Sequence, residues 1–338
     1  MNEHHRAGGG FRNPWPTAEG LHKNTGDMLR WMLERFSNPG APNPKPHEVP
    51  RAQPAIARPV ASPDELRTTY VGHATFLLQL NGLNLLTDPV WSERASPVQW
   101  AGPRRFSPPG IDWKELPPIH AVLLSHDHYD HLDADTAHRL ATRFPDALWV
   151  TPLGYTRLLQ GFGVRFVHEL DWWQDVTLRG ESGEVRVIAT PAQHWTRRIG
   201  TRPNERLWCS FVLQTDNASI YFGGDSGFCP AFEEIGARYA PFDHVLLPIG
   251  AYEPRWFMKP AHMNPEEAVE AYRALGGTGK FIGMHWGTFR LTDEPPLEPP
   301  VRVAEAWRAA GLSDEDLCVL SIGETLITSC TSDLRRVS

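Results

Sequence analysis

The chain has 338 residues, of which 41% are hydrophobic and 22% charged, a balance that excludes disorder of the whole chain. Its formal net charge of −7 argues against a protein that binds nucleic acid. The longest apolar stretches, such as 75–80 and 245–249, are far shorter than the roughly 20 residues of a membrane helix. Four cysteines without a C-x-x-C pair and an N-terminus without a secretory signal predict a cytoplasmic protein with free thiols.

Residues 1–63 are predicted to form an N-terminal extension. Residues 1–26 look irregular, and apolar side chains then recur at helical spacing from Met28 to Phe36. This short amphipathic helix has two interpretations: it docks on the core, which is the commoner case, or it lies on a membrane surface. Eight prolines from Pro39 to Pro63 exclude a helix or the interior of a sheet, so an extended strap is expected there.

Residues 64–328 show strands followed by helices, twice over. The first round has strands at 68–71, 76–80, 83–87, 121–125, 148–151, 164–167 and 185–189, with helices at 134–144 and 155–161. The second has strands at 210–214, 219–222, 244–247, 280–284 and 318–320, with helices at 232–239, 265–275 and 301–310. This order predicts an α/β fold of two sheets packed face to face with helices outside, and an irregular tail at 329–338.

The strongest chemical signal is a histidine- and aspartate-rich loop, residues 126–131, directly after the buried strand 121–125. Histidine and carboxylate are ligands that zinc, iron and manganese accept. His126 and His128 are expected on one face of an extended turn. Asp130 and His131 lie past the bend and can serve a neighbouring ion. The spacing favours this interpretation strongly over a merely solvated loop.

Three further candidates follow predicted strands: His194, Asp225 and His285. Each is weak by itself, because a lone histidine at a strand end is more often a surface group with satisfied hydrogen bonds. Together with His126, His128, Asp130 and His131 of the loop they supply five histidines and two aspartates. That set suits two metal ions that share one bridging carboxylate.

The order of these residues resembles the metallo-β-lactamase superfamily. Longer runs are similar to the N-acyl-phosphatidylethanolamine-hydrolysing phospholipase D family, and they lie at 11–16 (FRNPWP), 170–173 (LDWW), 229–236 (CPAFEEIG) and 248–258 (PIGAYEPRWFM). The similarity extends from about Phe11 to Thr325. Asp127 and Ser226 depart from the animal members, which have asparagine and threonine there, and neither is expected to be a ligand.

The resemblance implies an αββα sandwich with two zinc ions. Carried over by motif position, the first ion would be bound by His126, His128 and His194. The second would be bound by Asp130, His131 and His285. Asp225 would bridge the two ions, Asp88 would brace the histidine loop, and His262 would face the substrate phosphate. Iron or manganese could occupy the same ligands.

The resemblance also implies hydrolysis of N-acyl-phosphatidylethanolamine to N-acylethanolamine and phosphatidic acid. Asp130, Asp225 and His262 are the candidate catalytic residues, with His262 as imidazolium or hydrogen-bond donor to the leaving oxygen. The implied protein is a peripheral membrane enzyme, as a homodimer, with a phospholipid substrate. A soluble lactonase or cyclic-phosphodiester hydrolase would keep every ligand without needing lipid, and a metal-stabilised binding protein would show no turnover.

A bilayer substrate requires apolar side chains near the site. The resemblance shifts the interpretation of the helix at 28–36 toward lipid contact. The candidate lipid-contacting residues are Met28, Trp31, Met32, Phe36, Trp256 and Phe257. For Trp172 and Trp173 core packing is the favoured interpretation.

Overall fold

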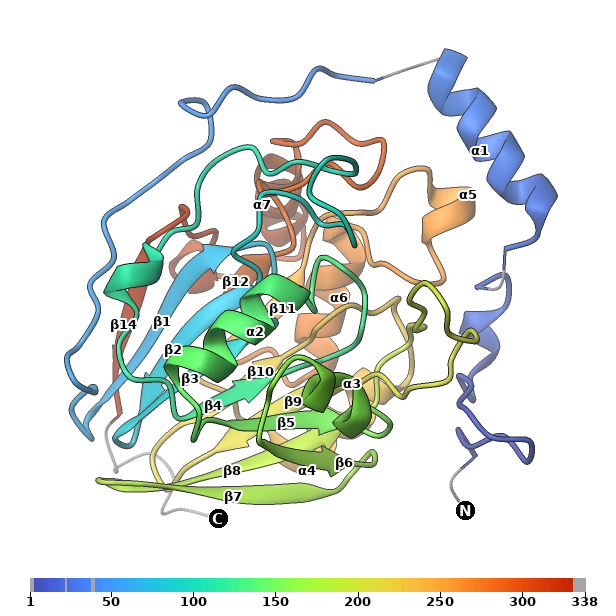
Figure 1. Ribbon diagram of the computed structural model, residues 1–338. Helices are drawn as coiled ribbons and strands as arrows, with labels where there is room; N and C mark the ends of the chain where they lie inside the picture. The colour runs from blue at the N-terminus through green and yellow to red at the C-terminus, as the bar shows by residue number, and fades with distance from the viewer. Residues whose placement is uncertain (1–2, 22, 38–39, 331–338) are drawn as a thin grey trace.

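The computed structural model describes residues 3–21, 23–37 and 40–330. In this part of the chain, two seven-stranded sheets pack face to face and helices cover their outer faces (Figure 1). The predicted αββα sandwich is therefore confirmed. The first sheet, in the order β14-β1-β2-β3-β4-β5-β6, contains β1 (Glu65–Gly72), β2 (Thr75–Leu80), β3 (Leu83–Thr87), β4 (Ala121–Leu123), β5 (Leu148–Pro152), β6 (Phe166–Leu170) and β14 (Thr325–Ser329).

The second sheet has the strand order β13-β12-β11-β10-β9-β8-β7. Its strands are β7 (Asp175–Gly180), β8 (Gly183–Thr190), β9 (Ser210–Gln214), β10 (Ser219–Phe222), β11 (His244–Pro248), β12 (Lys280–Met284) and β13 (Leu317–Cys318). The α-helices are α1 (Thr25–Ser37), α2 (Ala134–Arg143), α3 (Thr156–Gly161), α4 (Ala231–Tyr239), α5 (Arg255–Met258), α6 (Pro265–Ala274) and α7 (Pro299–Ala309).

The central strands are buried on both faces, which is why they are rich in apolar residues. Phe76 and Leu78 of β2 belong to the core that includes the second sheet. Leu77, between them, packs instead with Leu140 of α2 and Leu159 of α3. Because successive side chains of a strand point to opposite faces, each such strand contributes to two apolar layers.

The structure differs from the prediction in several strand bounds and in three elements that the prediction missed. The strand expected at 164–167 begins at Phe166 and forms β6. The edge strands β7 and β14 were missed, because their side chains are largely exposed or half-buried and leave no apolar run. The single turn α5 was missed because it is four residues long and lies between two prolines, Pro254 and Pro260.

Both sheets direct the carboxyl ends of parallel strands to the same edge of the sandwich. Strands β3 to β6 run parallel to one another in the first sheet. Strands β10 to β13 do so in the second. Loops that leave these ends therefore meet where the two sheets meet, which is the usual place for a site in such folds.

The N-terminal extension wraps around the outside of the sandwich (Figure 1). Its described strap, residues 40–63, forms neither helix nor strand and is held by bonds such as Ala52 N to Ile322 O at 2.9 Å. Pro39 and residues 331–338 lie outside the described residues. The division into extension, domain and tail stays a prediction. No helix in the described part of the chain has the length and apolar character of a membrane span.

A buried histidine links the sheets at the edge away from the histidine loop. His244, the first residue of β11, makes hydrogen bonds through Nδ1 to Thr68 Oγ1 at 2.9 Å and through Nε2 to Thr328 Oγ1 at 2.8 Å. Burial lowers the pKa of His244 to about 3. Its ring is therefore neutral in the folded state over the whole mildly acidic range.

We predict that His244 loses part of its contribution to stability as pH falls below the ordinary histidine pKa of about 6.5. Between pH 6.5 and 3 the unfolded state binds a proton that the folded state does not. The free-energy difference between wild type and His244→Asn should shrink by about 2 kcal/mol from pH 7.5 to pH 5. Urea titrations at both pH values measure it, and a pH-independent difference would contradict the prediction.

Candidate metal centre

All seven predicted ligands lie at the edge where the carboxyl ends of the strands meet. The loop from His126 to His131 follows β4 of the first sheet. His194 follows β8, Asp225 follows β10, and His285 comes directly after β12, all in the second sheet. The cluster is thus assembled from both halves of the sandwich.

His126, His128 and His194 form the first group of nitrogen atoms. His128 Nδ1 lies 2.9 Å from His126 Nε2 and 3.2 Å from His194 Nε2. The remaining nitrogens of two rings are held from behind: His126 Nδ1 is 2.9 Å from Ser125 Oγ, and His194 Nδ1 donates to Ala261 O at 3.0 Å. These bonds orient the Nε2 atoms of both rings toward a shared point.

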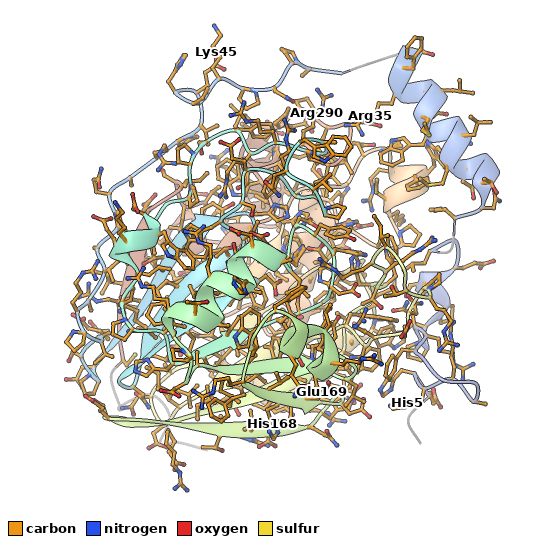
Figure 2. All side chains as sticks on the ribbon, viewed as in Figure 1. His5, Arg35, Lys45, His168, Glu169 and Arg290 are labelled. Atoms are coloured by element: carbon orange, nitrogen blue, oxygen red, sulfur yellow. The ribbon has the colours of Figure 1, made fainter. Side chains whose placement is uncertain are left out.

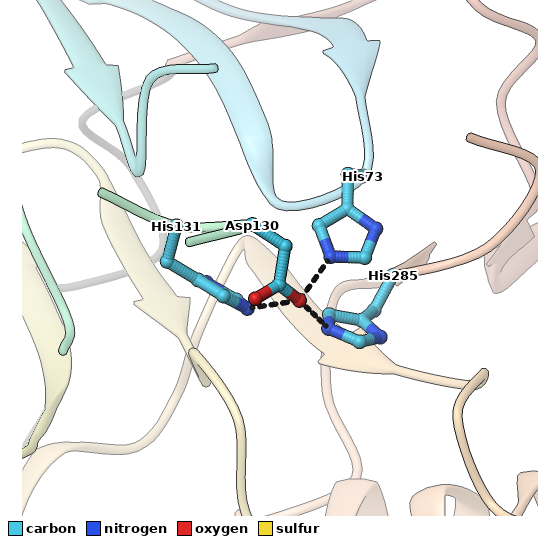
Figure 3. A group of neighbouring side chains, drawn as sticks. All are labelled: His73, Asp130, His131 and His285. Carbon is cyan, nitrogen blue, oxygen red and sulfur yellow. Dashed lines mark hydrogen bonds and ion pairs between the residues drawn. The ribbon is translucent and has the colours of Figure 1, made fainter. Parts of the chain in front are cut away.

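Asp130, His131 and His285 form the second group, shown in Figure 3. Asp130 Oδ2 lies 3.5 Å from His131 Nε2 and 3.4 Å from His285 Nε2. A further histidine, His73, approaches the same oxygen with its Nε2 at 2.9 Å. The second group therefore has one more imidazole than the sequence motif predicts.

Asp225 lies between the two groups. Its Oδ2 is 3.2 Å from Nε2 of both His131 and His285, and 3.9 and 3.8 Å from Nε2 of His126 and His194. The preceding Gly224 has a φ of +55°, and a Cβ there would lie 2.8 Å from Ser125 Cβ. A glycine at this position lets the Asp225 loop approach the end of the neighbouring sheet closely.

Asp88 lies beneath the histidine loop, at the end of β3. Its carboxylate accepts hydrogen bonds from Ser125 N at 2.7 Å, Ser125 Oγ at 2.6 Å and His131 Nδ1 at 2.7 Å. Because Nδ1 makes this bond, the other ring nitrogen of His131, Nε2, faces Asp130 and Asp225. Asp88 thus fixes both the start of the loop and the orientation of one candidate ligand.

The electrostatics divide the cluster into two parts. Burial lowers the pKa of His126 and His194 well below the usual value, so both rings are neutral. Burial opposes ionisation of Asp225, but the His131 and His285 rings outweigh it and lower its pKa well below the usual range. Burial likewise disfavours a charged His285, but Asp225 and Asp130 raise its pKa to about 9. The carboxylates therefore favour positive charge beside them.

Several polar atoms of the cluster are buried and have no hydrogen-bond partner in the structure. They are His128 Nε2, His131 Nε2, His285 Nδ1 and Nε2, and Asp225 Oδ1. Unpaired buried polar atoms are costly, and buried carboxylates need a compensating charge. Divalent cations supply that charge and take imidazole and carboxylate as ligands, so the residues present fit the metal-ion pair that the sequence predicts.

His262 borders the cluster from the loop after α5. Its Nδ1 lies 3.8 Å from Asp225 Oδ2 and is buried without a hydrogen-bond partner. Burial lowers its pKa to about 4. The ring is therefore neutral at neutral pH in this structure.

A cavity of about 500 Å³ opens beside the cluster. His128, Asp130, Asp225 and His262 line it. Apolar residues make up much of the remaining lining, among them Leu21, Met28, Trp31, Phe257 and Met258, and two cationic residues, Lys23 and Arg197, also line it.

The helix α1 contributes to this wall with one of its faces. Trp31 stacks on Phe257 with ring centroids 4.8 Å apart and donates from Nε1 to Asp293 Oδ2 at 2.6 Å. Arg35 adds a 3.2 Å ion pair to Asp293 on the loop that also carries Arg290 (Figure 2). The helix is thus attached to the sandwich at one side.

The other candidate lipid contacts of the sequence have different surroundings. Met32 is 63% exposed and Phe36 is 88% exposed, on a helix with no buried residue. Trp256 faces the polar side of α1, with its Nε1 donating to Glu34 Oε2 at 3.0 Å and Arg30 over its ring. The helix therefore has a docked face and an exposed apolar face. The docked face agrees with the first of the two interpretations, and lipid contact by the exposed face stays a prediction.

The first residues of the chain also reach the metal cluster. Asn13 Nδ2 donates to His194 O at 2.8 Å. His4 and His5 both bind the Asp171 carboxylate, at 2.6 and 2.8 Å, and His5 is the more exposed of the two. Trp172 is buried beneath this segment, as its core-packing interpretation predicts. The N-terminal segment therefore supports the strand end that carries His194.

Two residues of the site were missed by sequence reasoning. His73 is a single histidine in the turn between β1 and β2, and Ser125 was read only as the end of a strand. Neither has a motif around it. A buried turn with a histidine would have been the only signal for His73.

Comparison with known proteins places this geometry in a family. The sequence matches the beta-lactamase superfamily domain over residues 83–286. A Caenorhabditis elegans relative named N-acyl-phosphatidylethanolamine-hydrolyzing phospholipase D 1 is 40% identical over 267 residues, covering 77% of this chain and 75% of the relative. An uncharacterized protein of Mycobacterium tuberculosis is 43% identical over 287 residues, covering 82% and 73%. The mitochondrial enzyme of that phospholipase name from Saccharomyces cerevisiae is 32% identical, covering 74% and 53%.

Solved structures agree at the level of the fold. Igni18, a metallo hydrolase from Ignicoccus hospitalis, superposes with a TM-score of 0.59 at 21% identity, covering 78% of this chain and 99% of that one. An isothiocyanate hydrolase from Delia radicum gut bacteria gives a TM-score of 0.61 at 20% identity, covering 78% and 100%. With the domain match and the relatives above, the chain belongs to the metallo-β-lactamase superfamily and is a metal-dependent hydrolase of that fold.

Proposed function

We propose that the protein is a zinc-dependent phospholipase D-type enzyme that hydrolyses N-acyl-phosphatidylethanolamine to N-acylethanolamine and phosphatidic acid. The observation that carries this proposal is the cavity that is lined both by residues of the metal cluster and by a group of apolar side chains. A substrate with a phosphodiester between long acyl chains needs both. Relatives that carry the name of this activity, at 40% and 32% identity, support the same substrate class.

The proposed ligand set follows the two groups seen in the structure. The first ion would be held by His126, His128 and His194, the second by Asp130, His131 and His285, with Asp225 between them. When bound, such a pair of ions lowers the pKa of water and neutralises charge that develops at phosphorus. Zinc is the proposed metal because imidazoles predominate, and iron or manganese fit the same donors.

Side chains around the cavity would bind the ions and the substrate. Asp130 and Asp225 border it and supply the negative charge that holds the cluster in place. His262 is the candidate hydrogen-bond donor to the leaving ethanolamine oxygen, because it lines the cavity and its Nδ1 has no protein partner. Trp31 and Phe257 would hold an acyl chain and exclude water from that side.

The free apolar face of α1 is proposed to lie on the membrane. Leu29, Met32 and Leu33 are 58%, 63% and 58% exposed, and Phe36 is 88% exposed. Ile199, which is 78% exposed, lies at the neighbouring pocket beside His128 and Asp130. Exposed apolar side chains on elements that border a site are typical of a surface that contacts lipid. The enzyme would then be a peripheral protein of a cytoplasmic membrane face.

We predict two divalent ions per chain after purification with added zinc. The cluster offers seven ligands and leaves buried nitrogen and oxygen atoms unpaired without ions. Removal of the ions by a chelator should lower the unfolding temperature, because a ligand that binds only the folded state stabilises it. Elemental analysis measures the content, and fewer than one ion per chain would refute the ligand set.

We predict that Asp225→Asn lowers turnover by at least about a hundredfold while circular dichroism stays that of the wild type. The carboxylate is the group that faces both sets of histidines, and the apolar core lies elsewhere. Asp127→Asn is the matched control in the same region. Its carboxylate is buried too, but it binds Arg197 N and Arg206 Nη1. A near wild-type rate for Asp225→Asn would show that it does not bridge the ions.

We predict that replacing both Met32 and Phe36 by serine weakens binding to phospholipid vesicles by more than tenfold. Each large apolar side chain buried in lipid is worth roughly 1.5–3 kcal/mol, and about 1.4 kcal/mol is a factor of ten. Both side chains are largely exposed, so the fold should not suffer. Trp31 is left intact because it lines the cavity. Vesicle co-sedimentation measures the effect.

The control variant is Phe166→Ser, an exposed aromatic side chain on β6 of the sandwich, distant from α1 in Figure 1. It should bind vesicles as the wild type does. Hydrolysis of a short water-soluble phosphodiester should stay unchanged in all variants, because the cluster is untouched. Unchanged vesicle binding by the double variant would place the lipid surface elsewhere. Turnover of soluble lactones or cyclic phosphodiesters without activity on vesicles would favour the soluble hydrolases considered above.

A further inference from the structure

His73 is the residue of the cluster that neither the motif nor the proposed ligand set uses. It lies in the turn between β1 and β2, and its side chain is 1% exposed. Its backbone has a φ of +61°, in the left-handed region that is sparsely populated by residues other than glycine. Such strain persists only where the surrounding structure holds it, and it concentrates at functional sites.

The backbone of His73 is tied to a candidate ligand in the other sheet. Its carbonyl oxygen accepts a hydrogen bond from His285 N at 2.8 Å. His285 also has a positive φ, +64°, and the two ring centroids are 3.8 Å apart. The turn of the first sheet and the end of β12 in the second are thus locked together at the site.

The side chain of His73 contacts a second candidate ligand. Three imidazole nitrogens surround Asp130 Oδ2, and His73 Nε2 is the nearest at 2.9 Å, against 3.4 Å for His285 and 3.5 Å for His131 (Figure 3). A carboxylate oxygen only accepts, so Nε2 must carry the proton and donates it to Asp130. A protonated nitrogen has no lone pair to offer a metal ion.

Asp130 is the ligand that most needs such support. Its side chain is 13% exposed and borders the cavity, whereas that of Asp225 is 1% exposed. A carboxylate at the rim is free to rotate unless a donor fixes one oxygen. Asp88 plays the corresponding part for His131, through a 2.7 Å bond to Nδ1 from beneath the loop.

We propose that His73 is a positioning residue for the second metal ion: its Nε2–H donates to Asp130 Oδ2 and sets the orientation of that carboxylate beside His131 and His285. The inference rests on the ligand set proposed above. In this arrangement His73 does not bind the metal ion but acts on it through the ligand Asp130. The first ion, at His126, His128 and His194, has no contact with His73 in that arrangement and is independent of it.

Two substitutions separate the hydrogen bond from the backbone. In His73→Gln the amide nitrogen can reach the place of Nε2. In His73→Asn the amide is shorter and cannot reach Asp130. Asparagine tolerates a positive φ better than most residues, so its effect is not one of backbone strain. His244→Asn is the matched control, because it also replaces a buried histidine but at the opposite edge of the sandwich.

The experiment measures zinc binding by chelator competition and the absorption spectrum of the Co²⁺-substituted protein, without any lipid. His73→Asn should lower the affinity for the second ion by about 10- to 100-fold and leave the affinity for the first unchanged. Loss of a hydrogen bond to a metal ligand has an effect of this size in other metal sites. His73→Gln should restore most of the affinity. In both variants the Co²⁺ bands should keep their positions, since the number of nitrogen ligands is the same. His244→Asn should bind both ions as the wild type does.

Unchanged affinity for both ions in His73→Asn would overturn the proposal. So would an equal loss in His73→Asn and His244→Asn, which would make the effect one of general stability. If His73→Gln fails like His73→Asn and the Co²⁺ spectrum loses a nitrogen ligand, His73 is itself a ligand and the positioning role is refuted. A wild-type protein that binds a single ion would refute the ligand set itself, whereas absence of lipid hydrolysis would leave these affinities as they are.

Discussion

The structure depends on a concentration of carboxylates and imidazoles at a place where water is nearly excluded. Asp225 is 1% exposed in its side chain, and five histidine nitrogens lie within 3.9 Å of one of its oxygens. Burying such charge is expensive unless a cation balances it. Asp88 and Asn13 hold residues of this cluster in place through hydrogen bonds.

The sandwich makes this concentration possible because the ligands come from both sheets. The His126–His131 loop belongs to the first sheet, and His194, Asp225 and His285 belong to the second. Bound ions would therefore join the sheets at this edge. At the other edge His244 joins them through neutral hydrogen bonds to Thr68 and Thr328. The two links differ in kind, since one needs a cation and the other needs an uncharged ring.

The N-terminal extension completes the lining of the cavity beside the metal cluster. The sandwich supplies the metal cluster and Phe257 of α5 to the cavity, and α1 of the extension adds Trp31, which stacks on Phe257. The same extension reaches under the cluster, where Asn13 binds the backbone of His194. The extension thus contacts both the chemical groups and the proposed acyl-chain surface. In the proposed function it would couple substrate entry to the geometry of the metal site.

The sequence by itself determined those features of this protein that depend on residues close together in the chain. The loop 126–131 is recognisable because its ligands are adjacent, and central strands are recognisable because burial on both faces leaves an apolar run, as at 245–247. The order of strands and helices predicted two packed sheets with helices outside. His194, Asp225 and His285 were weak candidates one by one, and it was the resemblance to a known family that assigned them as ligands.

Only the tertiary structure decided the rest, because it depends on contacts between distant segments. The edge strands β7 and β14 are defined by their partners, not by apolar runs of their own. The two faces of α1 are distinguished only by the docking of Trp31 on Phe257 and Asp293, which lie more than 200 residues away in the chain. His73 became part of the site because a strained turn in one sheet meets Asp130 and His285, and no spacing in the sequence records that meeting.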